Sequence, residues 1–146
     1  MPELAMNKRA RYDYEILETL EAGLVLTGQE VKSVREGRMI LTGAHAVIAK
    51  GELVLVGAQI PVYKAAGMLE GYDSKRTRKL LVHKAELAKL FGKLEQKGLT
   101  FVPISVYTKG PFIKMSLGLG RGKREYDKRE TIKKRDLDRE ARRSLE

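Results

Sequence analysis

Short runs of apolar or alternating residues, each about as long as a β-strand, recur along most of the chain. They predict strands over residues 12–17, 23–27, 40–49, 52–60, 79–83, 99–107 and 112–117. Lys50 and Gly51 lie between two of these runs and predict a hairpin turn. The hydrophobic pattern is therefore typical of a mainly β protein.

Two segments have helical spacing instead. Residues 29–36 place Val31 and Val34 three residues apart before Gly37, which predicts a short helix. Residues 84–97 predict a second helix, with a stripe of Leu87, Leu90, Phe91 and Leu94 before Gly98. Open strand edges invite mispairing, so many short strands in a small domain favour closure. The sequence predicts an OB-fold-like closed antiparallel β-barrel with two to three flanking helices.

The pattern divides the chain into three regions. Residues 1–11 are expected to form a basic N-terminal arm, residues 12–119 the barrel, and residues 120–146 a flexible basic tail. The glycine-rich segment 118–123 is expected to be a flexible hinge between the barrel and the tail. The loop 61–73 has no clear period and is expected to be mobile.

The tail contains 11 cations and 7 anions but few apolar side chains. Asp127 and Glu130 have the spacing of a capping box, which favours a helix in the residues that follow. The apolar residues are too few to offset the entropy of ordering the segment. We expect the tail to be disordered when free and helical when a partner neutralises its cations. A solvated helix that only confers solubility is the alternative.

Charge adds a class of partner to this picture. The chain has 29 Lys and Arg against 19 Asp and Glu, a formal net charge of +10, which is typical of proteins that bind polyanions. The nine aromatic residues are not interleaved with the basic runs, which favours recognition of a folded RNA over an extended strand. The longest apolar stretch, residues 53–58, is far shorter than the ~20 residues that span a bilayer. A cytoplasmic protein without membrane contact is expected.

Residue patterns typical of catalysis are weak. The chain has no cysteine, so disulfides and thiolate metal sites are excluded. His45 and His83 lie in strand-like segments without a metal-ligand pattern, and Arg124 stands where a phosphate loop needs Ser or Thr. We expect no enzymatic activity, metal or cofactor. An RNA-processing enzyme whose carboxylates assemble only in space remains an alternative.

Three groups of cations are candidate RNA contacts. The first is in the arm, the second precedes the strand predicted at 79–83, and the third extends through the tail from Arg121 to Arg143. Phosphate contacts from such groups give strong salt dependence but little base specificity. The first two groups are Lys8, Arg9, Arg11 and Lys75, Arg76, Arg78, Lys79.

Five blocks along the chain, taken in order, resemble the SmpB family. They are Asn7-Lys-Arg-Ala-Arg11, Leu20-Glu-Ala-Gly23, Gly28-Gln-Glu-Val-Lys-Ser33, Arg76-Thr-Arg-Lys-Leu-Leu81 and Gly122-Lys-Arg-Glu-Tyr-Asp-Lys-Arg129. The resemblance implies an OB-fold barrel that binds the transfer-RNA-like domain of transfer-messenger RNA (tmRNA). It also implies delivery of the alanyl-charged RNA, with elongation factor Tu, to the A site of a stalled ribosome for rescue and tagging of the nascent chain.

The resemblance also implies roles for single residues. Asn7, Glu21 and Leu81 match family positions that contact the transfer-RNA-like domain, although Leu81 could equally belong to the core. The tail matches the segment that probes the empty messenger channel. Contacts near the decoding centre are implied for Tyr126, Asp127, Lys128 and Arg129, and channel contacts for Lys133, Lys134 and Arg135. Leu137 stands where some members have an aromatic residue.

The residues alone leave a second interpretation open. A generic OB-type nucleic-acid module, such as a ribosomal or initiation protein, would share the basic charge and the strand pattern. For a member of the SmpB family, a monomer is expected, with elongation factor Tu as an indirect partner through the charged RNA.

Overall fold

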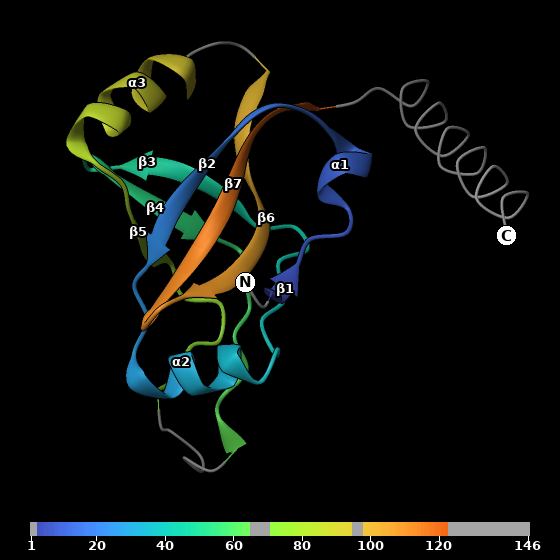
Figure 1. The fold of residues 1–146 in the computed structure, drawn as a ribbon, viewed down its shortest axis with the longest axis vertical. Coiled ribbons are helices and arrows are strands. Elements are labelled where there is room, and N and C mark those ends of the chain that lie inside the picture. The colour runs from blue at the N-terminus through green and yellow to red at the C-terminus, as the bar shows by residue number, and fades with distance from the viewer. Residues whose placement is uncertain (1–2, 65–70, 95–97, 123–146) are drawn as a thin grey trace, which may run out of the picture.

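The computed structural model describes residues 3–64, 71–94 and 98–122. Within these residues the chain forms a mainly β domain whose sheet closes on itself (Figure 1). The elements in order are β1 (Glu3–Met6), α1 (Ala10–Asp13), β2 (Tyr14–Leu24), α2 (Gly28–Arg35), β3 (His45–Ala49), β4 (Glu52–Val56), β5 (Arg78–Leu81), α3 (Lys84–Leu94), β6 (Leu99–Lys109) and β7 (Phe112–Gly122).

The barrel closes because β6 pairs on both edges. The order of strands in the sheet is β1-β6-β3-β4-β5-β2-β7, and a further pairing of β6 with β7 completes the ring. Two strands share one edge of β6: Phe101 in its first half pairs with β3, and residues 105–107 pair with β1. All pairings are antiparallel. The predicted closed antiparallel barrel is confirmed.

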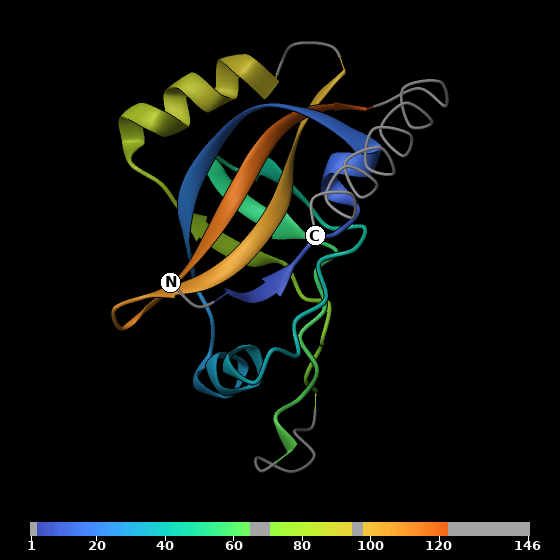
Figure 2. The same ribbon diagram turned by 45° about the vertical axis from the view of Figure 1, so that its right-hand side comes forward.

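The helices lie at the ends of the barrel. Figure 2 shows β2, β7 and β6 curving around it, with α3 and α2 at opposite ends. Inward-facing residues of all the long strands fill the interior, and Phe101, Leu55 and Met115 are fully buried there. Each such side chain contributes about 1.5–3 kcal/mol relative to an exposed one. Val34 of α2 and Leu90 of α3 join the same core, as their helical spacing predicts.

Local signals in the sequence explain two of these elements. Lys50 and Gly51 both have positive φ, 52° and 76°, and join β3 to β4 as the predicted hairpin turn. Helix α2 begins at a capping box, in which the Thr27 side chain accepts from the backbone N–H of Glu30 and Glu30 accepts from that of Thr27. The short helix predicted over 29–36 is thus confirmed.

The two strands predicted at 12–17 and 23–27 are parts of one continuous strand, β2, but Tyr12 and Asp13 lie in α1 and residues 25–27 follow the strand. A register shift between Ile16 and Glu18 places a bulge at Leu17, which changes the phase of the alternation. Before the bulge Ile16 faces outward opposite Gly120, and after it Leu20 faces inward opposite Leu117. The sequence pattern broke at this point because one extra residue shifts every later side chain to the other face.

The predicted N-terminal arm is not separate from the barrel in its described part. Glu3–Met6 pairs with β6, and the helix α1 follows at Ala10, whose side chain is buried. The segment lacked a visible apolar period because only a few of its residues face the barrel. Its cations are therefore held on the domain, just before β2 in the chain.

The predicted hinge at 118–123 is also wrong in its described part. Gly118 and Gly120 are interior positions of β7 and pair with both β2 and β6. A Cβ atom on Gly118 would lie 2.9 Å from Ile104 Cδ1 and 3.0 Å from Ile16 Cγ2. The glycine is needed because these side chains cross the outer face of β7 there, not because the chain must bend. Strand β7 consequently reaches Gly122, beyond the predicted barrel boundary at 119.

Two predictions concern residues outside the described part of the chain. The tail that the sequence predicts to be disordered, with its expected ribosome contacts, falls on residues 123–146, apart from its first three residues, which lie in β7. Residues 65–70 of the loop predicted to be mobile are likewise not described.

Candidate nucleic-acid interface

A groove of about 500 Å³ lies on the outer face of the barrel between β2, β5, β7 and the start of α3. Glu21 and Leu81, two of the three residues that the resemblance singled out, both line it. The sheet register explains how they meet, because Leu81 of β5 pairs with Gly23 of β2, two residues after Glu21. Alternate residues of a strand share a face, so both side chains project from the same outer surface.

Gly23 and Lys114 shape the floor and one wall of this groove. Lys114 of β7 pairs with Gly23 from the side opposite Leu81. A Cβ atom on Gly23 would lie 3.4 Å from Leu81 Cβ and 3.7 Å from Lys114 Nζ, so a larger residue would fill the space between them. Leu81 remains 53% exposed, so the structure assigns it to the surface and not to the core. The sequence prediction passed over Lys114, which lies in a strand without a cluster of cations.

The carboxylate of Glu21 is held by two side chains from β6. It accepts hydrogen bonds from the Tyr107 hydroxyl at Oε2 and from Lys109 Nζ, 3.3 Å from Oε1. The Tyr107 bond lowers the pKa of Glu21, and Lys109 acts in the same direction. Partial burial and the Glu21 charge raise the pKa of Tyr107 to about 12. At neutral pH Glu21 is therefore an ionised acceptor and Tyr107 a donor.

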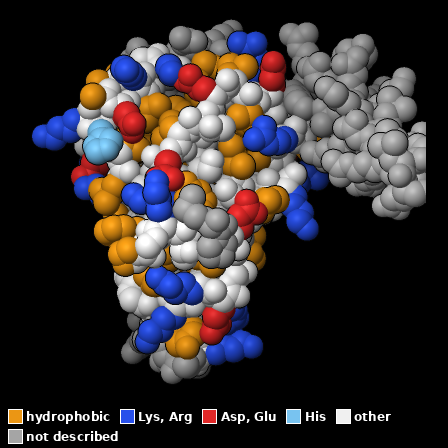
Figure 3. All heavy atoms as spheres, viewed as in Figure 1, with side chains coloured by type: hydrophobic (Ala, Val, Ile, Leu, Met, Phe, Trp, Pro, Cys, Tyr) orange, Lys and Arg blue, Asp and Glu red, His pale blue; other side chains and the backbone are white. Residues whose placement is uncertain are grey.

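The face that carries the groove has mixed chemistry. Figure 3 shows positive, negative and hydrophobic side chains interspersed, with no continuous basic surface. Exposed apolar groups include Leu81 and Phe112, and the ammonium of Lys114 lies 5.6 Å from the centre of the Phe112 ring. A carboxylate can accept from base amino groups or 2′-hydroxyls, apolar groups can pack on bases, and cations can neutralise phosphates. This mixed surface therefore suits a structured RNA, which presents bases and sugars as well as phosphates, better than a surface of cations alone would.

Asn7 lies in a separate pocket of about 100 Å³. Its Nδ2 donates to the carbonyl oxygen of Pro103 at 3.0 Å, and its Oδ1 accepts from the backbone N–H of Arg9 at 3.3 Å. With only 9% of its surface exposed, Asn7 fixes the turn between β1 and α1. The structure therefore brings Glu21 and Leu81 together but places Asn7 elsewhere.

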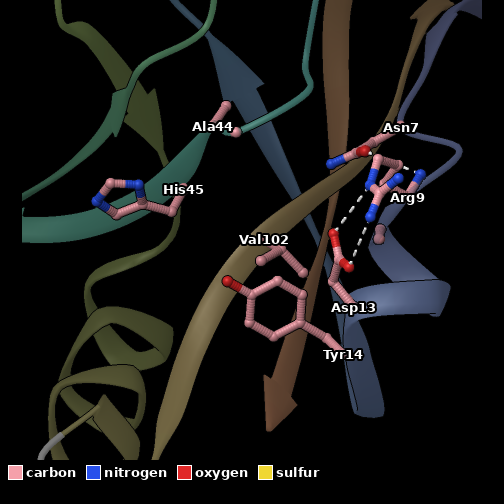
Figure 4. A pocket seen from close by; sticks show the side chains of 9 residues that line it. Asn7, Arg9, Asp13, Tyr14, Ala44, His45 and Val102 are labelled. Atoms are coloured by element: carbon pink, nitrogen blue, oxygen red, sulfur yellow. Dashed lines mark hydrogen bonds and ion pairs between the residues drawn. The ribbon is translucent and has the colours of Figure 1, made fainter. Parts of the chain in front are cut away.

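Of the cations predicted in the arm, Arg9 lines this second pocket. Figure 4 shows Arg9 and Asp13 joined on one side of it, with His45 of β3 on the other. The Arg9–Asp13 ion pair is 3.3 Å long, and the Arg9 guanidinium lies 5.0 Å from the centre of the Tyr12 ring. Lys8 and Arg11 are exposed. All three cations are exposed enough for a partner to reach them.

The cluster at 75–79 divides into surface and interior residues. Lys75 and Lys79 are exposed, and Lys79 pairs with Glu52 at 3.1 Å. Arg78 is completely buried, so the prediction that it contacts RNA is wrong. Its guanidinium pairs with Glu30 at 2.6 Å. A run of cations in sequence cannot reveal this, because alternate residues of β5 face opposite sides of the sheet.

Glu30 organises a buried ionic network beneath α2. It accepts hydrogen bonds from both Arg76 and Arg78, while Tyr72 donates to its Oε2 at 3.3 Å. Burial opposes ionisation of Glu30, but the bonds from Arg76, from the Thr27 backbone and from Arg78 outweigh it and lower its pKa to about 2. Arg78 also donates to the carbonyl oxygens of Ala58 and Ser74, both at 2.9 Å. The Thr27–Glu30 spacing is typical of a capping box, but we did not predict this network from the sequence.

The described residues contain no group of three or more His, Cys, Asp or Glu side chains placed to hold a metal ion. Among the same residues no helix is long and apolar enough to cross a membrane.

The fold defines this chain as a small OB-like barrel with a candidate binding groove on its outer face. Comparison with known proteins gives the family. The family model described as SmpB protein matches residues 4–146, so the chain belongs to the SmpB family.

Relatives and a solved structure agree with this assignment. An SsrA-binding protein of Gloeothece citriformis is 50% identical over 139 residues, which cover 95% of this chain and 90% of the relative. An SsrA-binding protein of Coprothermobacter proteolyticus is 51% identical over 144 residues, covering 98% and 96%. A chain from the solved structure "tmRNA-SmpB: a journey to the center of the bacterial ribosome" matches with a TM-score of 0.68 and 49% identity, covering 87% of this chain and 92% of that one.

Proposed function

We propose that this protein binds the transfer-RNA-like domain of tmRNA through the groove of Glu21 and Leu81 and brings the RNA to the A site of stalled ribosomes. The observation that carries the proposal is the meeting of an exposed carboxylate and an exposed leucine, from different strands, in one groove beside Lys114. Membership of the SmpB family and the likeness to SsrA-binding proteins support it.

The residues of the groove have different roles in binding. Glu21 accepts hydrogen bonds from base amino groups or 2′-hydroxyls, and Leu81 packs against an unstacked base. Lys114 neutralises phosphate at the edge of the groove. Lys75 and Lys79, together with Lys8, Arg9 and Arg11, extend the positive surface along the RNA backbone, whereas Asn7 shapes the turn that presents the last three.

The tail is the second functional part of the proposal. Tyr126, Asp127, Lys128 and Arg129 contact the ribosome near the decoding centre, and Lys133, Lys134 and Arg135 line the empty messenger channel. The resemblance of the block 122–129 to the family supports this assignment. We further propose a monomeric cytoplasmic protein without a cofactor or catalysis of its own, which meets elongation factor Tu through the alanyl-charged RNA.

Substitutions on the barrel and on the tail separate the two parts. We expect Glu21→Lys to weaken binding of the isolated transfer-RNA-like domain at least tenfold, because it replaces the acceptor with a donor and reverses its charge. We expect Lys128→Ala with Arg129→Ala to leave this affinity unchanged but to block tagging on stalled ribosomes. Gel-shift titration and a reconstituted tagging reaction measure the two effects.

Truncation after Gly122 is the control for this division, because it leaves every described strand intact. It should bind the RNA domain like the full chain and fail in tagging. If truncation reduced RNA affinity as severely as it reduced tagging, the division would be wrong. Sequencing of RNA that copurifies with the protein adds a check, since one dominant tmRNA species is expected. A broad mixture of structured RNAs would favour a generic nucleic-acid module.

A further inference from the structure

The side chains that hold Glu21 come from a strand that is not its neighbour. Glu21 of β2 pairs with Ser116 of β7, and Ser116 pairs in turn with Ser105 of β6. Tyr107 lies two residues beyond Ser105, so its hydroxyl meets Glu21 diagonally across the whole width of β7. Neighbouring strands are about 4.8 Å apart, so this contact spans roughly 10 Å of backbone. The small side chain of Ser116 leaves the path open.

We propose that Tyr107 and Lys109 are positioning residues that hold the Glu21 carboxylate over β7, at the edge of the groove, for RNA binding. The proposal rests on the function proposed above. Tyr107 engages Oε2 and Lys109 engages Oε1, so each carboxylate oxygen has one protein donor. An ionised carboxylate has about four acceptor sites. One site on each oxygen is left for two donors of the RNA, such as a base amino group and a 2′-hydroxyl.

This arrangement adds to affinity in a way that an unrestrained glutamate does not. A free Glu side chain loses rotational freedom when it binds, whereas one held by two donors has already lost most of it. The Tyr107 bond also lowers the pKa of Glu21, which extends the ionised form to more acidic pH. Tyr107 itself is partly buried, and it pairs with Lys114 of the groove on one side and with Glu3 of β1 on the other. The positioning device is thus anchored in the barrel wall.

The first test is a double-mutant cycle on binding of the isolated transfer-RNA-like domain, measured by titration calorimetry. Tyr107→Phe keeps the ring and removes the hydroxyl, and we expect affinity to fall about 3- to 10-fold. Glu21→Gln should cost at least as much. In the Glu21→Gln background Tyr107→Phe should cost less than about twofold, because its effect passes through the carboxylate. An equal cost in both backgrounds would show that Tyr107 contacts the RNA directly and would overturn the positioning role.

The second test follows the carboxyl group without RNA. In an NMR titration of the free protein, the pKa of Glu21 should rise in Tyr107→Phe toward its ordinary value, and less so in Lys109→Met. Affinity of Tyr107→Phe for the RNA should then begin to fall at a higher pH than that of the wild type. An unchanged Glu21 pKa in Tyr107→Phe would remove the basis of the proposal.

Two control variants match these substitutions. Lys93→Met removes a similar lysine that pairs with Glu18, also on β2 but outside the groove. Tyr63→Phe removes a hydroxyl on a different part of the surface, beside Lys32. Both should bind RNA like the wild type. If Glu21→Gln weakened binding while Tyr107→Phe did not, the positioning role would fail and the proposed function would stand. If the wild type did not prefer the tmRNA domain to unrelated structured RNAs, the proposed function itself would fail.

Discussion

Two glutamates on neighbouring elements of this protein each pair with cationic side chains, but one is buried and the other is exposed. Glu30 of α2 is fully buried and paired with two arginines, whereas Glu21 of β2 is exposed and paired with Tyr107 and Lys109. Both carboxyl groups have a lowered pKa. The difference is that solvent reaches the carboxylate of Glu21 and not that of Glu30. The bonds of Glu30 join α2 to the strands, while those of Glu21 leave acceptor sites open to a partner.

The largest expected effect comes from breaking the buried pair. Glu30→Gln leaves Arg78 charged and buried without its counter-ion, and we expect the free energy of unfolding to fall by about 3–5 kcal/mol. The matched variant Glu21→Gln should leave stability unchanged, because its carboxylate is exposed. Urea denaturation followed by circular dichroism measures both. Equal effects of the two substitutions would contradict the contrast.

The buried glutamate also makes stability depend on pH. Its folded pKa is about 2, below the ordinary value of 4.5, so its contribution is present above pH 4.5 and is lost as the pH falls toward 2. Glu30→Gln should flatten this part of the stability curve. Denaturation midpoints measured between pH 2 and pH 6 test the prediction. A curve for Glu30→Gln that was parallel to that of the wild type would assign the acid sensitivity to other groups.

The two arginines of the network should differ from each other. Arg78→Met removes a fully buried guanidinium that also holds two carbonyl groups, and we expect a loss of roughly 3 kcal/mol. Arg76 is partly exposed, and Arg76→Met should cost about 1 kcal/mol. Thermal and urea unfolding of the purified variants give both values. A larger loss for Arg76→Met than for Arg78→Met would show that Arg76, and not Arg78, is the more important partner of Glu30.

Gly118 in β7 and Gly92 in α3 differ in how much room their surroundings leave for a side chain. Gly118→Ala places a methyl group against Ile104 and Ile16, so we expect a destabilisation of about 1–2 kcal/mol. Gly92→Ala in α3 meets no atom within 4 Å and should stabilise the protein by roughly 0.5–1 kcal/mol. Thermal denaturation of both variants provides the measurement. Stabilisation by Gly118→Ala would mean that the strand has room to yield there.

The smallest expected effect concerns a surface lysine. Lys79 is exposed and paired only with the exposed Glu52 among its described contacts. If it contacts phosphate, Lys79→Met should weaken RNA binding about equally for all sequences and reduce the slope of log K against log salt by about 1. Filter binding at several salt concentrations measures the slope. An unchanged slope would remove Lys79 from the interface.

Sequence reasoning succeeded where a signal is local. The Lys50–Gly51 turn, the helix α3 and the short helix before Gly37 each depend on residues close in the chain. The predicted stripe of α3 is only partly right, because Leu90 is buried but Phe91 is 54% exposed. It failed where the cause is distant. The bulge at Leu17 and the glycine at 118 are explained by partners on other strands, and no local pattern contains them.

The candidate site shows the same limit. The resemblance identified Glu21 and Leu81, and the structure places them in one groove. Charge alone also selected Arg78, which the alternation of β5 turns into the interior. Tyr107 and Lys109 could not be found from sequence, because their contact with Glu21 crosses an intervening strand. Spatial neighbours that are distant in sequence are what the structure adds.

The most direct test of the central claim is the affinity of the isolated transfer-RNA-like domain for Leu81→Glu and Ile40→Glu. Both leucine and isoleucine are about half exposed, at 53% and 47%, but only Leu81 lines the groove. We expect Leu81→Glu to bind at least tenfold more weakly than the wild type, because it adds a third carboxylate to a groove that already contains Glu21 and Glu86. We expect Ile40→Glu to bind normally. Equal affinities of the two variants would contradict the assignment of RNA binding to this groove.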